Sequence, residues 1–259
     1  MNQIMSNYHT HTTRCKHAYG SDEQFVLSAI KAGYTSLAFT DHSPWLLYPF
    51  EAGSIRMHIS EMEEYVESIN HLKRQYRDEI SIYVGLEAEY YRDRIDWLIN
   101  LKQKHQLDLL ILGNHFRGHE SNETYYGNYR DKTNVYKHYV EDAIDAMATE
   151  AYSIFAHPDL YFRTNNKVDK VALEAAQQIC DAANHYNVAL EYNLGGIRYG
   201  DNSYPKDEFW QVVAKNKNIS VIGVDAHRPK HLEDIELRKK AQRFLNNIGV
   251  VVVEEIKLK

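Results

Sequence analysis

Short apolar segments alternate with longer amphipathic segments along the whole chain. Most of the short segments are apolar without a break, which is typical of strands covered on both faces. A further short segment, Val250–Val253, fits either an eighth strand or a terminal edge. We predict strands at Gln3–Tyr8, Thr35–Thr40, Ile80–Leu86, Leu107–Leu112, Tyr152–Ala156, Val188–Tyr192 and Ile219–Val224.

The longer segments carry helix signals. Ser21 stands three residues before Gln24, which is the spacing of a capping box, and Gly33 fits the end of that helix. Ser60 and Glu63 repeat the spacing ahead of an apolar stripe. Further helices are predicted near Asp93–Lys104, Thr133–Thr149, Lys170–Tyr186, Lys206–Lys215 and Leu232–Asn247.

This alternation predicts an α/β fold with a parallel sheet and right-handed crossovers. Seven or eight strand–helix units favour a (β/α) barrel over an open sheet. No Pro/Gly-rich linker interrupts the pattern, so we expect one domain over residues 1–259. Long irregular stretches follow three strands, on the side where such barrels build active sites: His42–His58, His115–Asp131 and Asn193–Pro205.

Composition narrows the class of protein. Hydrophobic residues make up 44% of the 259 residues and charged residues 25%, as in globular proteins. A net charge of −6 argues against a general nucleic-acid or membrane-surface binder. Residues 1–13 hold no signal-peptide pattern, no apolar run is long enough to span a membrane, and there are only 2 cysteines. We expect a soluble cytoplasmic protein.

The 14 histidines carry the strongest chemical signal because many follow predicted strands. Two pairs with i, i+2 spacing each lie on one side of an extended segment. Side chains at the carboxyl ends of barrel strands converge at one mouth, and mixed imidazoles and carboxylates suit zinc, manganese or iron. The metal-competent residues at these positions are His9, His11, Asp41, His42, Glu87, His115, His157, Glu191, Asp225 and His227.

Several of these residues have a plainer explanation. His17 lies in a loop, where a ligand and a surface imidazole are equally plausible. Asp41 with His42 also fits a helix cap followed by a surface histidine. Glu87 and Glu89 share a face, and periodicity does not choose between them. For Cys15 we favour an ordinary loop thiol over a ligand.

Six motifs, in order, resemble those of the PHP (polymerase and histidinol phosphatase) superfamily, and they span essentially the whole chain. Residues 54–57 with the following helix, and residues 80–90, are similar to the histidinol-phosphate phosphatase branch. The motifs are Tyr8-His9-Thr10-His11-Thr12 with His17, Thr40-Asp41-His42, Gly85-Leu86-Glu87, Gly113-Asn114-His115, Ala156-His157-Pro158-Asp159 and Gly223-Val224-Asp225-Ala226-His227.

The resemblance implies a distorted seven-stranded barrel and three divalent metal ions, zinc, manganese or iron. It selects Glu87 over Glu89 as the bridging carboxylate. The implied ligands are His9, His11, Glu87 and Asp225 for one ion, Glu87, His115 and His157 for a second, and His17, His42 and His227 for a third.

The resemblance also implies a phosphatase that converts L-histidinol phosphate to L-histidinol in histidine biosynthesis. A hydroxide held between two ions would attack phosphorus, and Asp225, His42 and Asp41 are the candidate acid–base residues. Arg117, Arg163 and Arg198 are candidates for binding phosphate. Glu191 and Glu89, with the loop tyrosines 125, 126, 129, 161 and 199, are candidates for an acidic, aromatic pocket.

Two alternatives remain open. One is a PHP phosphoesterase that acts on another small monoester or a nucleotide, although the acidic balance counts against long nucleic acids. The other is a metal-binding domain without catalytic activity, which no appended polymerase-like segment supports.

Overall fold

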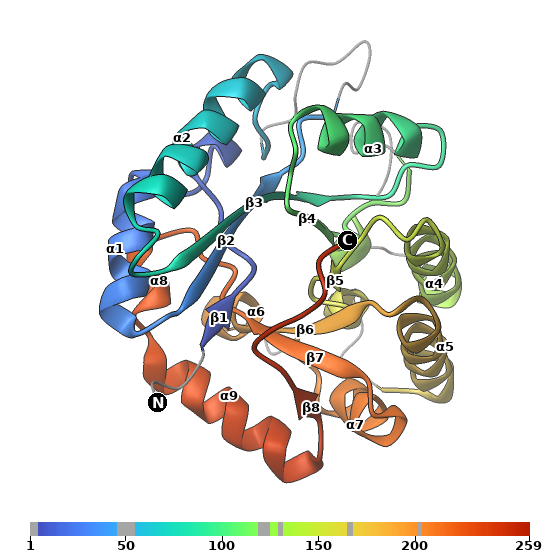
Figure 1. Ribbon diagram of the computed structural model, residues 1–259. Helices are drawn as coiled ribbons and strands as arrows, with labels where there is room; N and C mark the ends of the chain where they lie inside the picture. Colours follow the sequence, from blue (N-terminus) through green and yellow to red (C-terminus); the bar gives the residue numbers. More distant parts are fainter. Residues whose placement is uncertain (1–4, 46–54, 119–124, 129–131, 165–167, 201–203) are drawn as a thin grey trace.

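Parallel strands arranged in chain order form the centre of the molecule (Figure 1). The computed structural model describes residues 5–45, 55–118, 125–128, 132–164, 168–200 and 204–259. Every neighbouring pair in the eight-stranded sheet is parallel, as we predicted from the alternating pattern. The strands are β1 Ser6–Asn7, β2 Ser36–His42, β3 Ser81–Ala88, β4 Leu109–Leu112, β5 Ile154–Phe155, β6 Ala189–Asn193, β7 Ile219–Gly223 and β8 Val251–Val252.

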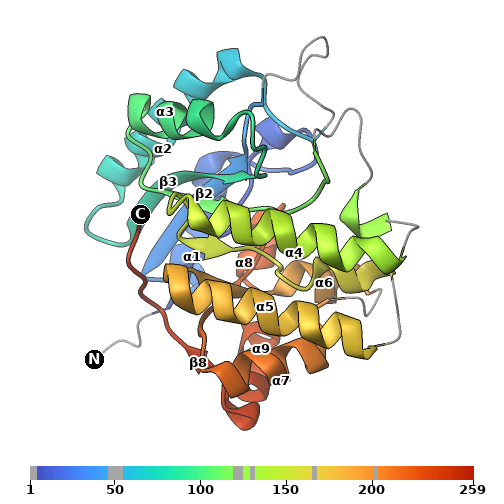
Figure 2. The same cartoon turned by 90° about the vertical axis from the view of Figure 1, so that its right-hand side faces the viewer.

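Helices surround the strands, and α4 and α5 cover the side that faces the viewer in Figure 2. The α-helices are α1 Asp22–Ala32, α2 Met62–Gln75, α3 Ile95–Lys104, α4 Lys132–Ala148, α5 Lys170–Tyr186, α6 Leu194–Tyr199, α7 Asp207–Asn216, α8 Pro229–Leu232 and α9 Ile235–Ile248. Single 3₁₀ turns occur at η1 Thr13–Cys15, η2 Ile59–Glu61, η3 Tyr126–Asn128 and η4 Leu160–Thr164. None of the helices in these described ranges is long and apolar enough to cross a membrane.

The helix starts follow the sequence signals in one case and depart from them in another. Ser21 and Gln24 form the predicted capping box, and Gly33 ends α1 with a left-handed φ of 89°. The predicted box at Ser60 is wrong, because a 3₁₀ turn precedes α2. The capping residue is instead His58, whose ring accepts a hydrogen bond from the Ser60 amide while Glu61 accepts one from the His58 amide.

The sheet closes into a distorted barrel where β7 meets β1. The His11 amide donates to the Ala226 carbonyl at 2.9 Å, and the Ala226 amide donates to the His9 carbonyl at 3.2 Å. At the other end, the short strand β8 pairs with β7, and the Glu254 carboxylate accepts from the Ser6 amide at 2.7 Å. The barrel we predicted is therefore confirmed, and the undecided segment at Val250–Val253 is an eighth strand, Val251–Val252.

The inside of the barrel changes from apolar to polar along its axis. Ala189 on β6 belongs to an apolar cluster inside the barrel, whereas Glu191 and Asn193 follow on the same face of the strand. The C-terminal segment crosses the amino-end opening in Figure 1, where Ile256 and Leu258 pack against the cluster. The buried imidazoles and carboxylates inside the barrel therefore lie at the carboxyl ends of the strands.

Candidate metal centre

All nine predicted metal ligands lie together at the carboxyl ends of the strands. The two N-terminal histidines follow β1, Glu87 is on β3, and the remaining ligands end or follow β2, β4, β5 and β7, with His17 after η1. A cavity of about 390 Å³ opens at this point, and every ligand except the buried His9 lines it. The predicted ligands thus gather at one mouth of the barrel, as their positions after the strands indicated.

A first group joins both ends of the chain. His9 Nε2 lies 3.1 Å from His11 Nε2 and 3.4 Å from Glu87 Oε2. His11 Nε2 is also 3.4 Å from Asp225 Oδ1. All four side chains are less than a tenth exposed, so their donor atoms converge in a buried site.

A second group uses the other oxygen of Glu87. Glu87 Oε1 lies 3.0 Å from His157 Nε2 and 3.3 Å from His115 Nε2. Its two oxygens therefore face two different sets of imidazoles. This is the arrangement that a bridging carboxylate requires.

A third group lies at the rim of the cavity. His17 Nε2 is 2.9 Å from His227 Nε2, and the His42 ring centroid is 5.5 Å from that of His17. His42 also reaches the centre of the site, since its Nδ1 lies 3.0 Å from Glu87 Oε2. The three groups are thus adjacent.

The donor atoms of this site fit metal ions better than they fit one another. Two imidazole nitrogens that face each other at about 3 Å share at most one proton, and this happens twice, in the His9–His11 and His17–His227 pairs. Among the described residues, His157 Nδ1 is buried without a hydrogen-bond partner, while His42 Nδ1 and Asp225 Oδ1 lie near Glu87 and His11 without forming a hydrogen bond. Imidazoles with carboxylates are a donor set that suits zinc, manganese and iron.

Burial and neighbouring charges set the ionisation of the site. Burial raises the pKa of the Glu87 carboxyl, but the imidazoles of His115, His9 and His42 outweigh it and lower the pKa well below its usual range. Burial lowers the pKa of His42 to about 3. Glu87 is therefore ionised and His42 neutral near pH 7, which are the forms that bind a cation. Burial lowers the pKa of His115, but Glu87 outweighs it and raises that pKa to about 10, so a metal ion that binds there displaces a proton.

Three of the imidazoles have a buried carboxylate behind them. Glu191 Oε1 lies 2.8 Å from His9 Nδ1, Asp41 Oδ1 is 3.4 Å from His11 Nδ1, and Glu89 Oε1 is 3.0 Å from His115 Nδ1. Such carboxylates fix the tautomer and orientation of a ligand histidine.

This geometry changes the roles we predicted for these three acids. Asp41 is buried behind His11 and does not line the cavity, a position that suits orienting this histidine. Glu191 is bound by His9, the His157 amide and Asn193, and Glu89 is paired with Arg56. Neither Glu191 nor Glu89 lines the cavity, so these two residues do not form the acidic substrate pocket that we expected.

Local backbone geometry helps to place the ligands. His157 and Asp225 adopt left-handed conformations, with φ of 33° and 51°, which are uncommon for residues other than glycine. Gly113 leaves space for Glu87 and Gly223 for Glu191, since an added Cβ would come within 2.7 Å and 1.8 Å of these carboxylates. Nothing in our sequence reasoning pointed to these two close approaches.

The three candidate arginines occupy different positions. Arg163 lines the cavity, and its Nη1 donates to the Tyr125 hydroxyl at 3.2 Å. Arg117 contacts His138 at 2.7 Å. Arg198 donates to the main-chain carbonyl oxygens of Val224 and Asp225, so it supports the end of β7 instead of facing the cavity.

The tyrosines divide in the same way. Tyr125 and Tyr199 line the cavity, whereas Tyr126 and Tyr161 are buried away from it, and Tyr129 lies outside the described residues. Tyr204, which we did not predict, adds a wall next to the His157 ring. The cavity beyond the ligands is therefore mainly aromatic, with Arg163 as its cation among the described residues.

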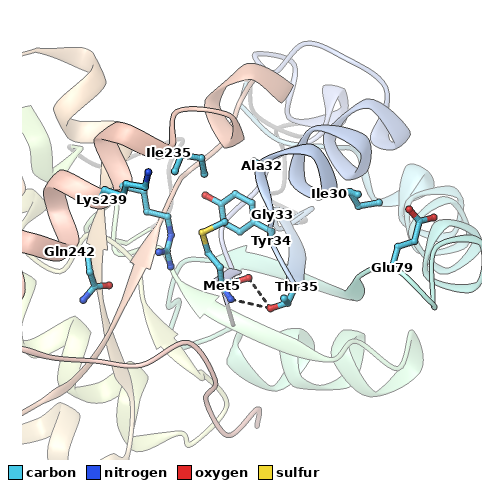
Figure 3. A pocket seen from close by; sticks show the side chains of 11 residues that line it. Met5, Ile30, Ala32, Gly33, Tyr34, Thr35, Glu79, Ile235, Lys239 and Gln242 are labelled. Carbon is cyan, nitrogen blue, oxygen red and sulfur yellow. Dashed lines mark hydrogen bonds between the residues drawn. The ribbon is translucent and has the colours of Figure 1, made fainter. Parts of the chain in front are cut away.

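A larger cavity of about 580 Å³ lies between α1 and α9, near β1 (Figure 3). Its lining includes Met5, Tyr34 and Ile235, with Glu79 as the one carboxylate among the described residues. It holds no histidine or cysteine, so size alone does not identify the site. The smaller, ligand-rich cavity is the candidate metal centre.

The fold and the site define a (β/α)-barrel protein with a candidate multinuclear metal centre at the carboxyl ends of its strands. The PHP domain model matches residues 7–194. The chain belongs to the PHP domain family.

Named relatives narrow the comparison. A protein of Deinococcus radiodurans named "Probable histidinol-phosphatase" is 25% identical over 229 residues, covering 85% of each chain. A protein of the same name from Schizosaccharomyces pombe is 26% identical over 251 residues, covering 85% of this chain and 80% of the relative. The histidinol phosphate phosphatase of Lactococcus lactis, solved with zinc, L-histidinol and phosphate, superposes with a TM-score of 0.75 at 19% identity and covers 98% of both chains.

Proposed function

We propose that this protein is a metal-dependent phosphatase that hydrolyses L-histidinol phosphate to L-histidinol and inorganic phosphate, as a step of histidine biosynthesis. The observation that carries the proposal is the convergence of six imidazoles and two carboxylates on one cavity of a PHP barrel, with the His9 imidazole buried directly behind them. The names of the relatives supply the substrate. We further propose that the chain is a single domain and works in the cytoplasm, where Cys15 and Cys180, both free in the structure, stay reduced.

The three groups of ligands support three divalent ions, zinc, manganese or iron. His9, His11, Glu87 and Asp225 would hold one, and Glu87 with His115 and His157 a second. His17, His42 and His227 would hold the third. The paired imidazole nitrogens and the buried atoms without a hydrogen bond described above support this assignment.

When bound, divalent ions lower the pKa of a water molecule and neutralise phosphoryl oxygens. In the reaction, a bond forms between the water oxygen and phosphorus, the bond from phosphorus to the histidinol oxygen breaks, and the leaving alkoxide takes up a proton. Asp225 lines the cavity as a carboxylate and is the residue we assign to accept the proton of the water. His42 is neutral because its pKa is about 3, so it serves as a ligand rather than as the acid we had considered.

Arg163 is the residue we assign to the phosphate group. It lines the cavity near Tyr125, and a guanidinium binds phosphoryl oxygens in a bidentate manner. Arg117 and Arg198 are engaged elsewhere, with His138 and with the end of β7. The aromatic walls suit the imidazole and ammonium groups of the substrate.

The test is release of inorganic phosphate by fully metallated protein from histidinol phosphate and from a panel of other small monoesters, including a mononucleotide. We expect histidinol phosphate to be hydrolysed with the highest kcat/KM, and a chelator to abolish the activity. Asp225→Asn should abolish it as well, and His71→Gln, on the exposed face of α2, should leave it unchanged. Efficient hydrolysis of another monoester with histidinol phosphate left intact would refute the substrate assignment. A metallated protein without any phosphatase activity would refute the proposal that this protein is a phosphatase.

A further inference from the structure

We propose that the ion at His17, His42 and His227 is the exchangeable one of the three, and that this ion and a phosphate group bind cooperatively. The inference rests on the metal centre of the proposed function. It adds an order of metal release and a link between metal binding and phosphate binding.

The first observation is the distribution of negative charge. The first group contains two carboxylates, Glu87 and Asp225, and the second group contains the other oxygen of Glu87. The third group is made of imidazoles only. The carboxylate oxygens nearest to it, Glu87 Oε2 beside His42 and Asp225 Oδ1 beside His227, already face His9 and His11.

The second observation is what stands behind each imidazole. In the first group, His9 and His11 have the carboxylates of Glu191 and Asp41 at Nδ1. In the third group, His17 Nδ1 lies 2.7 Å from the Cys15 main-chain carbonyl, and His227 Nδ1 lies between the Asp225 carbonyl at 3.2 Å and the Asp225 carboxylate at 3.3 Å. A neutral carbonyl makes a histidine a weaker donor to metal than a carboxylate does, so His17 is the least supported of these ligands.

The third observation is exposure. His17 is half-buried, whereas His9, His11 and Glu87 are each 1% exposed. His17 also stands on the turn after η1, outside the strands that carry the first group. Water and a chelator therefore reach the third group first.

The link to phosphate follows from the same charges. Asp225 and the shared Glu87 offset most of the charge of an ion in the first group, and Glu87 offsets part of the charge of an ion in the second. Neutral imidazoles leave the full double charge on an ion in the third group. A phosphate dianion in the cavity is the partner that compensates this charge. Two ligands that each stabilise the other must raise each other's affinity by the same factor.

The experiment measures metal per chain rather than activity. The metallated protein is dialysed against increasing concentrations of a chelator, with and without inorganic phosphate, and bound metal is counted by mass spectrometry. Sulfate at equal ionic strength is the control for screening. We expect one ion to leave first, giving a plateau at two per chain, and phosphate to raise the chelator concentration for this first step on the order of tenfold, with little effect on the later steps.

Two variants make the assignment specific. His17→Gln should hold two ions per chain and lose the phosphate effect, whereas His71→Gln should behave as the unaltered protein. The proposal is overturned if all ions leave in one step, or if phosphate has an equal effect or no effect at every step. It is also overturned if His17→Gln fails to retain two ions per chain. These outcomes are independent of substrate, because stepwise release can hold in a protein that leaves histidinol phosphate intact, and turnover can hold in one that loses its ions together.

Discussion

Replacing Gly223 by alanine tests whether Glu191 acts through His9. Gly223 ends β7, and a Cβ added there would lie 1.8 Å from Glu191 Oε1 and 2.3 Å from its Cδ. Contacts below 3.0 Å are not tolerated, so the carboxylate must retreat by at least 3.0 − 1.8 = 1.2 Å. The same oxygen holds His9 Nδ1 at 2.8 Å, and a retreat of this size breaks that hydrogen bond.

Two magnitudes follow. Loss of a carboxylate behind a ligand histidine costs about 10- to 100-fold in metal affinity. Overpacking of the buried strand end costs roughly 1–3 kcal/mol of unfolding free energy in the metal-free protein. We therefore expect Gly223→Ala to bind its tightest ion more weakly by one to two orders of magnitude, measured by competition with a chromogenic chelator, alongside a denaturant titration of the metal-free protein.

The design includes its own controls. Gly249→Ala introduces the same methyl group where no atom lies within 4 Å, at a left-handed φ of 85°, so it should lower the unfolding free energy but leave metal affinity unchanged. In a Glu191→Ala background the clash is removed, so Gly223→Ala should add little further loss of affinity. Normal metal affinity in Gly223→Ala, or fully additive losses in the double variant, would refute the reasoning.

Three further predictions concern other parts of the site. His115→Ala should lower metal content and phosphatase activity together, and His71→Ala should change neither, measured by elemental analysis and phosphate release. Arg163→Gln should raise the KM for a phosphate monoester about tenfold or more, since a charged hydrogen bond contributes about 1.5–3 kcal/mol; an unchanged KM would remove Arg163 from phosphate binding. Burial raises the pKa of Asp159 to about 7, although the Lys206 amide lowers it. A raised folded-state pKa favours the protonated form, so the contribution of this group to the unfolding free energy is fully present below about pH 4 and falls by up to roughly 4 kcal/mol as the pH rises to about 7. In denaturant titrations of metal-free protein, Asp159→Asn should reduce this fall in unfolding free energy with pH. An identical pH dependence in the variant would contradict the assignment.

The fold and the grouping of the ligands were predictable from sequence because both depend on local rules. Parallel strands bring their carboxyl ends to one mouth whatever their detailed packing, so a histidine or acid after each strand is enough to place the site. His115 and His157 illustrate this, since each follows a different strand and both reach Glu87. The left-handed conformation of Asp225 and the hydrogen bonds that join the β1 and β7 ends could not be predicted from the sequence pattern.

The role of each acid was not predictable, because it depends on depth along the barrel axis. Glu87 and Glu89 share a face, yet one lines the cavity and the other pairs with Arg56 and His115. Periodicity gives the face of a strand and not its depth, which the stagger between neighbouring strands decides. The structural role of Arg198 was not predictable for a related reason. Arg198 lies on α6, a short helix in a segment that we had interpreted as irregular, and its partners are the main-chain carbonyls just after β7.

The contact between the ends of β1 and β7 joins a segment that is translated early with one that is translated late. His17 and His227 meet across a separation of 210 residues, and the main-chain bonds beside them join the same two segments. During synthesis the first motif must therefore wait for nearly the whole chain before its partners exist. Metal binding by the complete set of proposed ligands requires the residues that follow β7 to have been translated. An ion bound between His17 and His227 would therefore link the earliest and latest segments of the chain.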